Sequence, residues 1–279
     1  MPSTQRSLQL SHVTMAYREW GKGRPIILLH GMADHGLMWQ PLGEAWQDCA
    51  RCLAPDLRGH GDSDKPTDID AYDANAIAAD LEALCDDLGL ATVAVIAHSW
   101  AAKVALLWAQ RHPNRLQKLV LVDPFFVNRF PSIARMTFPL LYRTLPFLKV
   151  MGPFASEADA VTCAQTLKQY RDWTPHQRQA FAAGLEQKSD GSWGSKFTCA
   201  ARDGIFADTV QTAGLTQITG VSTLMVLPKQ GLNQTPWQLR PYRTYLPQLQ
   251  EVSVPGNHWP HLVAPADLVT AIAPFLFAS

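Results

Sequence analysis

The chain has 279 residues, of which 47% are hydrophobic and 17% charged, as expected for an ordinary globular protein with one large domain. Lys and Arg total 24, as do Asp and Glu, so the charge argues against nucleic acid or a membrane as an obligatory partner. No apolar run has the length of a transmembrane span, and residues 1–6 lack the apolar stretch of a secretory signal. With five scattered cysteines that fit reduced thiols, these features predict a cytoplasmic protein.

Short apolar runs alternate with helical patterns along the first half of the chain. We expect two strands within residues 7–20, further strands at 26–29, 52–55, 92–97 and 119–122, and helices at 39–47, 71–88 and 100–111. Strands that are apolar on both faces are typical of a parallel sheet. The alternation predicts an α/β fold with a mostly parallel central sheet flanked by helices.

The alternation stops after Asp123. Residues 125–220 are mostly helical in pattern, and the strand–helix pattern returns at 223–227, 236–245, 249–254 and 264–277. We therefore expect a core domain made of residues 1–124 and 221–279, with residues 125–220 inserted into it as a helical cap.

Ser99 lies where an apolar, β-branched run ends and a helical pattern begins. A strand that turns sharply into a helix around one serine is a nucleophile elbow, and its neighbours need very small side chains. The residues at those positions are Ala97 and Ala101, in place of the usual glycines. A serine that only caps the helix is the alternative.

Four segments in this order resemble the α/β-hydrolase superfamily, specifically its esterase-like members with a helical cap. They are LLHGM at 28–32, DLRGHGDS at 56–63, AHSWA at 97–101 and PGNH at 255–258. The resemblance implies that Ser99 is the nucleophile and His258 its base, and that the backbone amides of Met32 and Trp100 form the oxyanion hole. It also places His30, Gly31 and His98 beside the substrate pocket.

The third member of the triad departs from the family pattern. The resemblance implies an Asp near position 231, but the loop at 228–236 contains no Asp or Glu. Asp123 directly follows the strand at 119–122, and some members of the superfamily take their acid from that position. We therefore expect Asp123 to orient His258. Asn233 as a neutral orienter and a serine–histidine dyad are the alternatives.

The inserted residues are rich in aromatic and aliphatic side chains. Phe125, Phe126 and Phe130 are expected to line an apolar acyl pocket, although the insertion also needs a core of its own. Residues 125–156 contain no acidic residue and four basic ones, which are Arg129, Arg135, Arg143 and Lys149. That pattern is typical of a solvated face, and an anionic acyl carrier or a membrane surface are the alternatives.

These features predict a serine hydrolase that cleaves carboxylic esters of small to medium, largely apolar acyl groups through an acyl-enzyme. Thioester or carbon–carbon bond hydrolysis, a cofactor-independent dioxygenase with a His/Asp dyad, and a non-catalytic receptor are the alternatives. Epoxide hydrolase and haloalkane dehalogenase chemistry is disfavoured, because those relatives carry an Asp where Ser99 stands. We expect no metal and no cofactor, since no ligand cluster has metal-binding spacing and residues 59–61 lack the third glycine of a dinucleotide loop. The oligomeric state is left open.

Overall fold

A central sheet organises the computed structural model, which describes residues 3–278; residues 1–2 and 279 of the predicted core lie outside that range. Its strands are β1 (Thr4–Gln9), β2 (Thr14–Trp20), β3 (Arg24–Leu29), β4 (Ala50–Pro55), β5 (Val93–His98), β6 (Leu116–Val122), β9 (Ser222–Gln230) and β10 (Leu249–Asn257). Their order is β1-β2-β4-β3-β5-β6-β9-β10. Only the β1–β2 and β2–β4 pairs are antiparallel. The predicted mostly parallel α/β sheet is confirmed.

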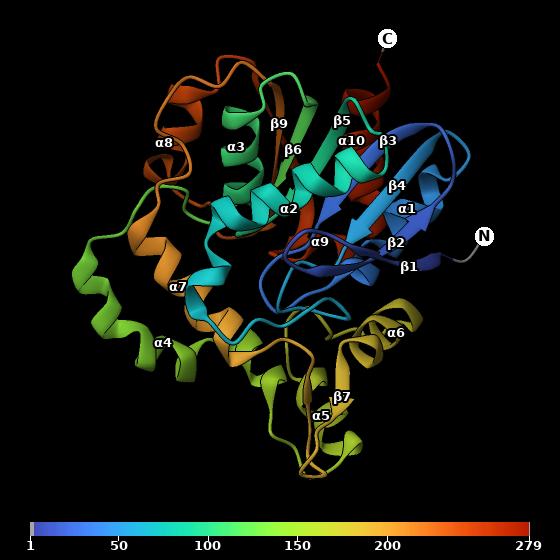
Figure 1. Ribbon diagram of the computed structural model, residues 1–279, viewed down its shortest axis with the longest axis vertical. Coiled ribbons are helices and arrows are strands. Elements are labelled where there is room, and N and C mark those ends of the chain that lie inside the picture. Colours follow the sequence, from blue (N-terminus) through green and yellow to red (C-terminus); the bar gives the residue numbers. More distant parts are fainter. Residues whose placement is uncertain (1–2, 279) are drawn as a thin grey trace.

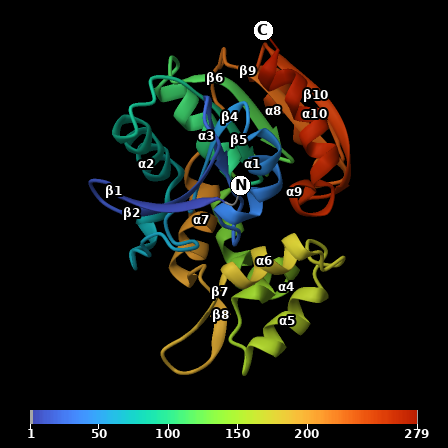
Figure 2. The same cartoon turned by 90° about the vertical axis from the view of Figure 1, so that its right-hand side faces the viewer.

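Helices cover both faces of the sheet (Figures 1 and 2). One face carries α2 (Ala74–Asp87), α3 (Ala101–Arg111) and α8 (Pro236–Tyr245), and the other carries α1 (Gln40–Trp46) and α10 (Pro265–Phe277). The strands serve both layers because successive side chains point to opposite faces. In β3, Ile27 and Leu29 pack toward α2 and α3, whereas Ile26 and Leu28 pack toward α1 and α10. This two-sided burial explains why residues 26–29 of the strand are all apolar.

Shorter elements follow the carboxyl ends of several strands. They are the 3-10 helices η1 (Gly36–Trp39) and η2 (Ile69–Tyr72) and the short helix α9 (Pro260–Val263). Strand β9 is longer than expected and reaches Gln230, because Gln230 pairs with Asn257 at the end of β10. The loop in which the family acid was expected is therefore shortened to a few residues after Gln230.

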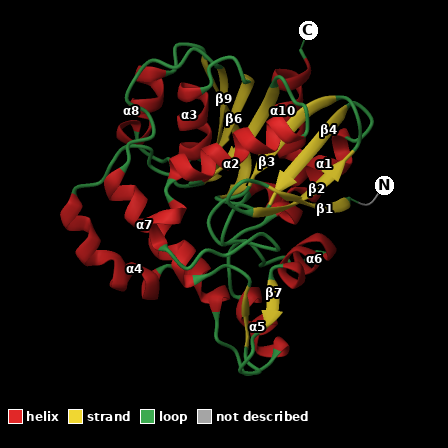
Figure 3. Ribbon diagram, in the orientation of Figure 1, coloured by secondary structure: helices red, strands yellow, loops and turns green. Residues whose placement is uncertain are grey.

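The segment between β6 and β9 forms a layer at one end of the sheet (Figure 3). Its elements are η3 (Ser132–Thr137), α4 (Phe138–Thr144), η4 (Pro146–Met151), α5 (Glu157–Gln165), α6 (Pro175–Ala183), β7 (Leu185–Gln187), β8 (Trp193–Ser195) and α7 (Cys199–Gln211). The hairpin β7–β8 was not expected from the helical pattern. Its strands have three residues each, too short for a clear alternation, and its turn contains Gly191 at φ 85°.

A buried ion pair joins this segment to the core. Lys103 of α3 donates to the Asp208 carboxylate of α7 over 2.5 Å, and both side chains are at most 5% exposed. The same carboxylate accepts a hydrogen bond from the Ala74 amide at the start of α2, at 3.2 Å. Helix α7 is thus held against α2 and α3 by charged groups as well as by apolar packing.

Candidate active site

Ser99 occupies a sharp turn between β5 and α3. Its φ is +55°, in the left-handed region that residues with a β-carbon seldom adopt. The flanking Ala97 and Ala101 are completely buried, so larger side chains at those positions would disturb the packing. The Ser99 amide donates to the Val122 carbonyl at 3.0 Å, which fixes the turn against β6. This is the elbow geometry that the sequence predicted.

His258 follows β10 and lies between Ser99 and Asp123. Its Nε2 is 2.8 Å from Ser99 Oγ, and its Nδ1 is 2.7 Å from Asp123 Oδ2. The carboxylate accepts a proton from Nδ1, which leaves the Nε2 lone pair facing the Ser99 hydroxyl. The His258 side chain is 12% exposed, whereas that of Asp123 is 1% exposed. The structure therefore brings together the three residues selected from the sequence, in the arrangement that nucleophilic catalysis requires.

Asp123 is held by the loop in which the family acid was expected. The Leu232 amide donates to its Oδ2 at 2.8 Å, and Asn233 Nδ2 donates to its Oδ1 at 2.9 Å. Asn233 also bonds to the Pro124 carbonyl at 2.9 Å, so its amide group bridges the ends of β6 and β9. Asn233 thus contacts the acid and not the imidazole. This contact was not expected from the sequence, which offered Asn233 only as an alternative partner of His258.

The space around position 231 explains why the chain has a glycine where an acid was expected. A β-carbon on Gly231 would lie 2.6 Å from Asp123 Oδ2 and 2.8 Å from its Cγ. Atoms do not approach that closely without displacement, so the Asp123 carboxylate occupies the space that a side chain at 231 needs. The acid therefore lies at the end of the neighbouring strand β6, and the glycine at 231 leaves room for its carboxylate.

The electrostatics of the triad follow from burial and hydrogen bonding. Burial lowers the pKa of His258 below its usual value of 6.5, with a further lowering from His98 and an opposing contribution from Asp123. Burial by itself raises the pKa of Asp123, but the hydrogen bonds from His258, Leu232 and Asn233 outweigh it and hold the pKa below its usual value. The resting site therefore combines a neutral imidazole with an ionised carboxylate, as a general base requires.

Two backbone amides beside Ser99 are free to bind an anion. Within residues 3–278, neither the Met32 nor the Trp100 amide donates a hydrogen bond to another protein group. Trp100 directly precedes α3, where helix amides lack intrahelical acceptors. A β-carbon on Gly31 would lie 3.2 Å from Ser99 Cβ, so glycine allows the Met32 loop to approach the nucleophile. The positions of both amides agree with the oxyanion hole that the resemblance implies.

The histidines expected beside the substrate are both engaged with the backbone. The Leu57 amide donates to His30 Nε2 at 2.9 Å, so His30 Nδ1 carries the proton and donates to the Gly31 carbonyl at 2.8 Å. His98 Nε2 donates to the His258 carbonyl at 2.7 Å. His30 is 0% and His98 1% exposed. These rings fix the oxyanion loop and the His258 loop rather than presenting both nitrogens to a ligand.

Aromatic residues follow the ends of β6 and β10, the two strands that carry Asp123 and His258. Phe126 lies 4.8 Å from Phe130 and stacks on Trp237 of α8 at 4.9 Å, and Phe125 is 36% exposed. That these phenylalanines line an acyl pocket stays a prediction. Trp259, which the sequence analysis did not select, lies 4.8 Å from the His258 ring and 6.1 Å from Phe147 of η4. Its position directly after His258, the residue expected to be the base, was the signal from which it could have been selected.

A strand–turn–helix serine with a buried histidine–aspartate pair, at the carboxyl edge of a mostly parallel sheet, defines an α/β protein with a hydrolase-type triad. Residues 24–265 match the family model for the alpha/beta hydrolase fold, and the chain belongs to that family of hydrolases. No helix within residues 3–278 is long and apolar enough to cross a lipid bilayer.

Relatives and solved structures of several activities are similar to this chain. "Epoxide hydrolase 2" of Siraitia grosvenorii is 31% identical over 169 residues, which are 59% of this chain and about half, 54%, of that relative. The structure of E-2-(acetamidomethylene)succinate hydrolase has a TM-score of 0.81 at 21% identity and covers 99% of this chain and 100% of its own. A thioesterase domain from the curacin biosynthetic pathway has a TM-score of 0.76 at 20% identity, covering 98% and 99%. These structural likenesses concern the fold.

Proposed function

We propose that the chain is a serine hydrolase that cleaves carboxylic esters of small to medium, largely apolar acyl groups. The observation that carries the proposal is the hydrogen-bonded series from Ser99 Oγ through His258 to Asp123, with distances of 2.8 and 2.7 Å. A serine hydroxyl is a weak nucleophile until a base within hydrogen-bonding distance takes its proton, and His258 is in that position.

The reaction would proceed in two stages. His258 Nε2 accepts the Ser99 proton as Oγ attacks the ester carbonyl, and the amides of Met32 and Trp100 bind the oxyanion that forms. Asp123 stabilises the imidazolium, which then donates its proton to the departing alcohol and leaves an acyl group on Ser99. Water activated by the same imidazole releases the acid and restores the serine.

The identity of the nucleophile favours ester hydrolysis over epoxide hydrolysis, the activity in the name of the Siraitia relative. Attack of a serine oxygen on an epoxide carbon would produce an ether, which has no carbonyl group for water to attack in a second stage. Attack on an ester produces an acyl ester, which the same triad can hydrolyse. Ser99 therefore supports acyl transfer in preference to epoxide opening.

The proposal is tested by labelling the purified chain with a fluorophosphonate and measuring hydrolysis of p-nitrophenyl esters from two to twelve carbons. Ser99→Ala and His258→Gln should each abolish both signals. Asp48→Asn, which changes an exposed carboxylate, serves as the matched control and should leave both unchanged. Labelling of wild type without turnover of any ester would overturn the hydrolase in favour of a receptor. Absence of labelling together with oxygen consumption on a heteroaromatic substrate would overturn it in favour of the dioxygenase.

Thioester hydrolysis on an acyl carrier is a second candidate. It is favoured by four exposed cations of residues 125–156, which form no ion pair within the described part of the chain; they are Arg129, Arg135, Arg143 and Lys149. A carrier protein with an acidic surface would complement them. Higher kcat/KM for an acyl carrier thioester than for the same acyl group on a small thiol, lost on changing Arg135 and Arg143 to Glu, would support this candidate.

A further inference from the structure

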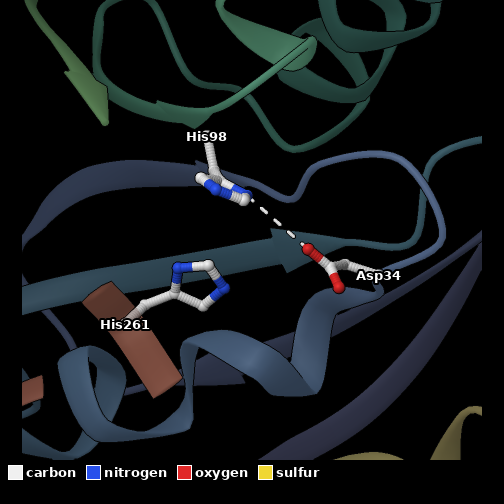
Figure 4. Close-up of side chains that lie close together, drawn as sticks. All are labelled: Asp34, His98 and His261. Carbon is white, nitrogen blue, oxygen red and sulfur yellow. Dashed lines mark ion pairs between the residues drawn. The ribbon is translucent and has the colours of Figure 1, made fainter. Parts of the chain in front are cut away.

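Asp34, His98 and His261 lie close together in the protein interior (Figure 4). The His98 ring is 4.6 Å from that of His258 in the triad. Asp34 lies in the loop between β3 and η1, His98 ends β5, and His261 belongs to α9. Their exposed fractions are 5%, 1% and 0%. One potential ligand atom from each residue lies within 4.8 Å of those of the other two. Three distant parts of the sequence thus contribute polar side chains to one buried point.

The hydrogen bonding of His98 determines what its other nitrogen can do. Nε2 lies 2.7 Å from the His258 carbonyl oxygen, which can only accept, so Nε2 carries a proton. In a neutral imidazole, Nδ1 then has a lone pair. That atom lies 3.6 Å from Asp34 Oδ2, and neither atom has another partner among the described residues. Two hydrogen-bond acceptors therefore face each other in a buried position. Such an arrangement requires a proton or a metal cation between them.

His261 adds a third unsatisfied group to the same place. Neither of its ring nitrogens has a hydrogen-bond partner within residues 3–278, although the residue is completely buried. The ring is held from two sides, by stacking on Trp39 at 4.7 Å and by an edge contact with His98 at 4.6 Å. A neutral imidazole in either tautomer has one lone pair to offer.

We propose that Asp34, His98 and His261 bind one divalent transition-metal ion, best matched by zinc. Two imidazole nitrogens and a carboxylate oxygen are a common zinc donor set. The 3.6 Å between Asp34 Oδ2 and His98 Nδ1 is close to the ~3.4 Å that separates two ligands bound tetrahedrally at about 2.1 Å. Metal-binding histidines usually donate their second N–H to a carbonyl or carboxylate, as His98 does to the His258 carbonyl.

The position assigns the ion a structural role. It would join the β3 loop, the end of β5 and α9 behind the His258 main chain, because His98 holds the His258 carbonyl directly. The Ser99 hydroxyl contacts a different part of His258, the imidazole Nε2. The evidence for the site does not rest on the proposed ester hydrolysis, and the site can be tested without an enzyme assay.

The first test measures metal content by plasma mass spectrometry after production of the full chain in zinc-supplemented medium and desalting. About one zinc per chain is expected in wild type, and less than about 0.1 in Asp34→Asn and in His261→Gln. His112→Gln and Cys49→Ser change an exposed imidazole and an exposed thiol and should keep the full content. Wild type without zinc would overturn the proposal and indicate that water or a proton satisfies these atoms. Zinc lost only in Cys49→Ser would also overturn it.

A second measurement uses the unaltered chain, in case the buried variants fail to fold. Cobalt is introduced in place of zinc, and its visible absorption reports coordination geometry. Intense bands typical of tetrahedral nitrogen and oxygen ligation, with imidazole scattering in the X-ray absorption spectrum, are expected. The weak spectrum of hydrated, octahedral cobalt would contradict the site.

Discussion

The carboxylate of Asp123 fills the space beside Gly231, so that a β-carbon at 231 would lie only 2.6 Å from Asp123 Oδ2. Strands β6 and β9 are neighbours in the sheet, and their ends therefore offer two places from which an acid can reach His258. The two positions exclude each other sterically.

We expect Gly231→Ala to reduce kcat/KM for an ester by at least about tenfold, because the new methyl group displaces Asp123 from His258. The effect should be relieved when the acid is moved: Asp123→Gly combined with Gly231→Asp should be more active than Asp123→Gly alone. Glycine tolerates the φ of +40° at position 123. Ester kinetics on the three variants check this. Equal activity of Asp123→Gly and the double variant would show that the two positions are not interchangeable.

Replacing Asp123 by Asn should lower kcat by about 10³ to 10⁴-fold, because an amide NH₂ facing Nδ1 favours the tautomer that cannot accept the Ser99 proton. Asn233→Ala is the matched comparison. It removes one of the hydrogen bonds to Asp123 while leaving the contact to His258, so its loss should stay near tenfold or less. Steady-state kinetics and burst amplitudes measure both. Near-normal turnover of Asp123→Asn with Ser99 still essential would remove Asp123 from the triad.

The pH dependence follows from the neutral base. Burial lowers the pKa of His258 from 6.5, and only the neutral imidazole accepts the Ser99 proton. The midpoint of the acid limb of kcat/KM should therefore lie below pH 6.5, so that most of the activity is present at pH 7. A pH–rate profile with two esters of different leaving groups checks this, since the free-enzyme midpoint must be the same for both. A midpoint above 6.5 would contradict the assignment.

The Lys103–Asp208 pair should matter for stability. Burial lowers the pKa of Lys103 and its pairing with Asp208 opposes that shift, so removing either partner leaves a buried charge without compensation. Lys103→Met should reduce the free energy of unfolding by about 3 to 5 kcal/mol. Lys103→Met with Asp208→Leu should recover part of the loss. Urea unfolding measures all variants, with the exposed Lys22→Met as control. A loss below 1 kcal/mol for Lys103→Met would show that the pair contributes little.

Local sequence features were sufficient for much of this architecture. The apolar runs and helical spacing predicted the parallel sheet and its flanking helices, and the helix Pro236–Tyr245 has the bounds expected for it. The small residues around Ser99 predicted the elbow, and the order of the motifs selected His258. Such features are local, because strand and helix periodicity and tight turns depend on neighbouring residues. The hairpin Leu185–Ser195 was missed because its strands are too short to show a period.

The contacts between side chains at the carboxyl edge of the sheet could be identified only from the tertiary structure. Asp123 and His258 are 135 positions apart and meet because β6, β9 and β10 are parallel neighbours whose carboxyl ends share one edge. The reason for a glycine at 231 and the link from Asn233 to Asp123 arise from that proximity. The group of Asp34, His98 and His261 has no metal-binding spacing in the sequence, because its members come from three separate strand ends. The sequence by itself determined most of the elements and selected the candidate nucleophile and base; strand order decided which side chains surround them.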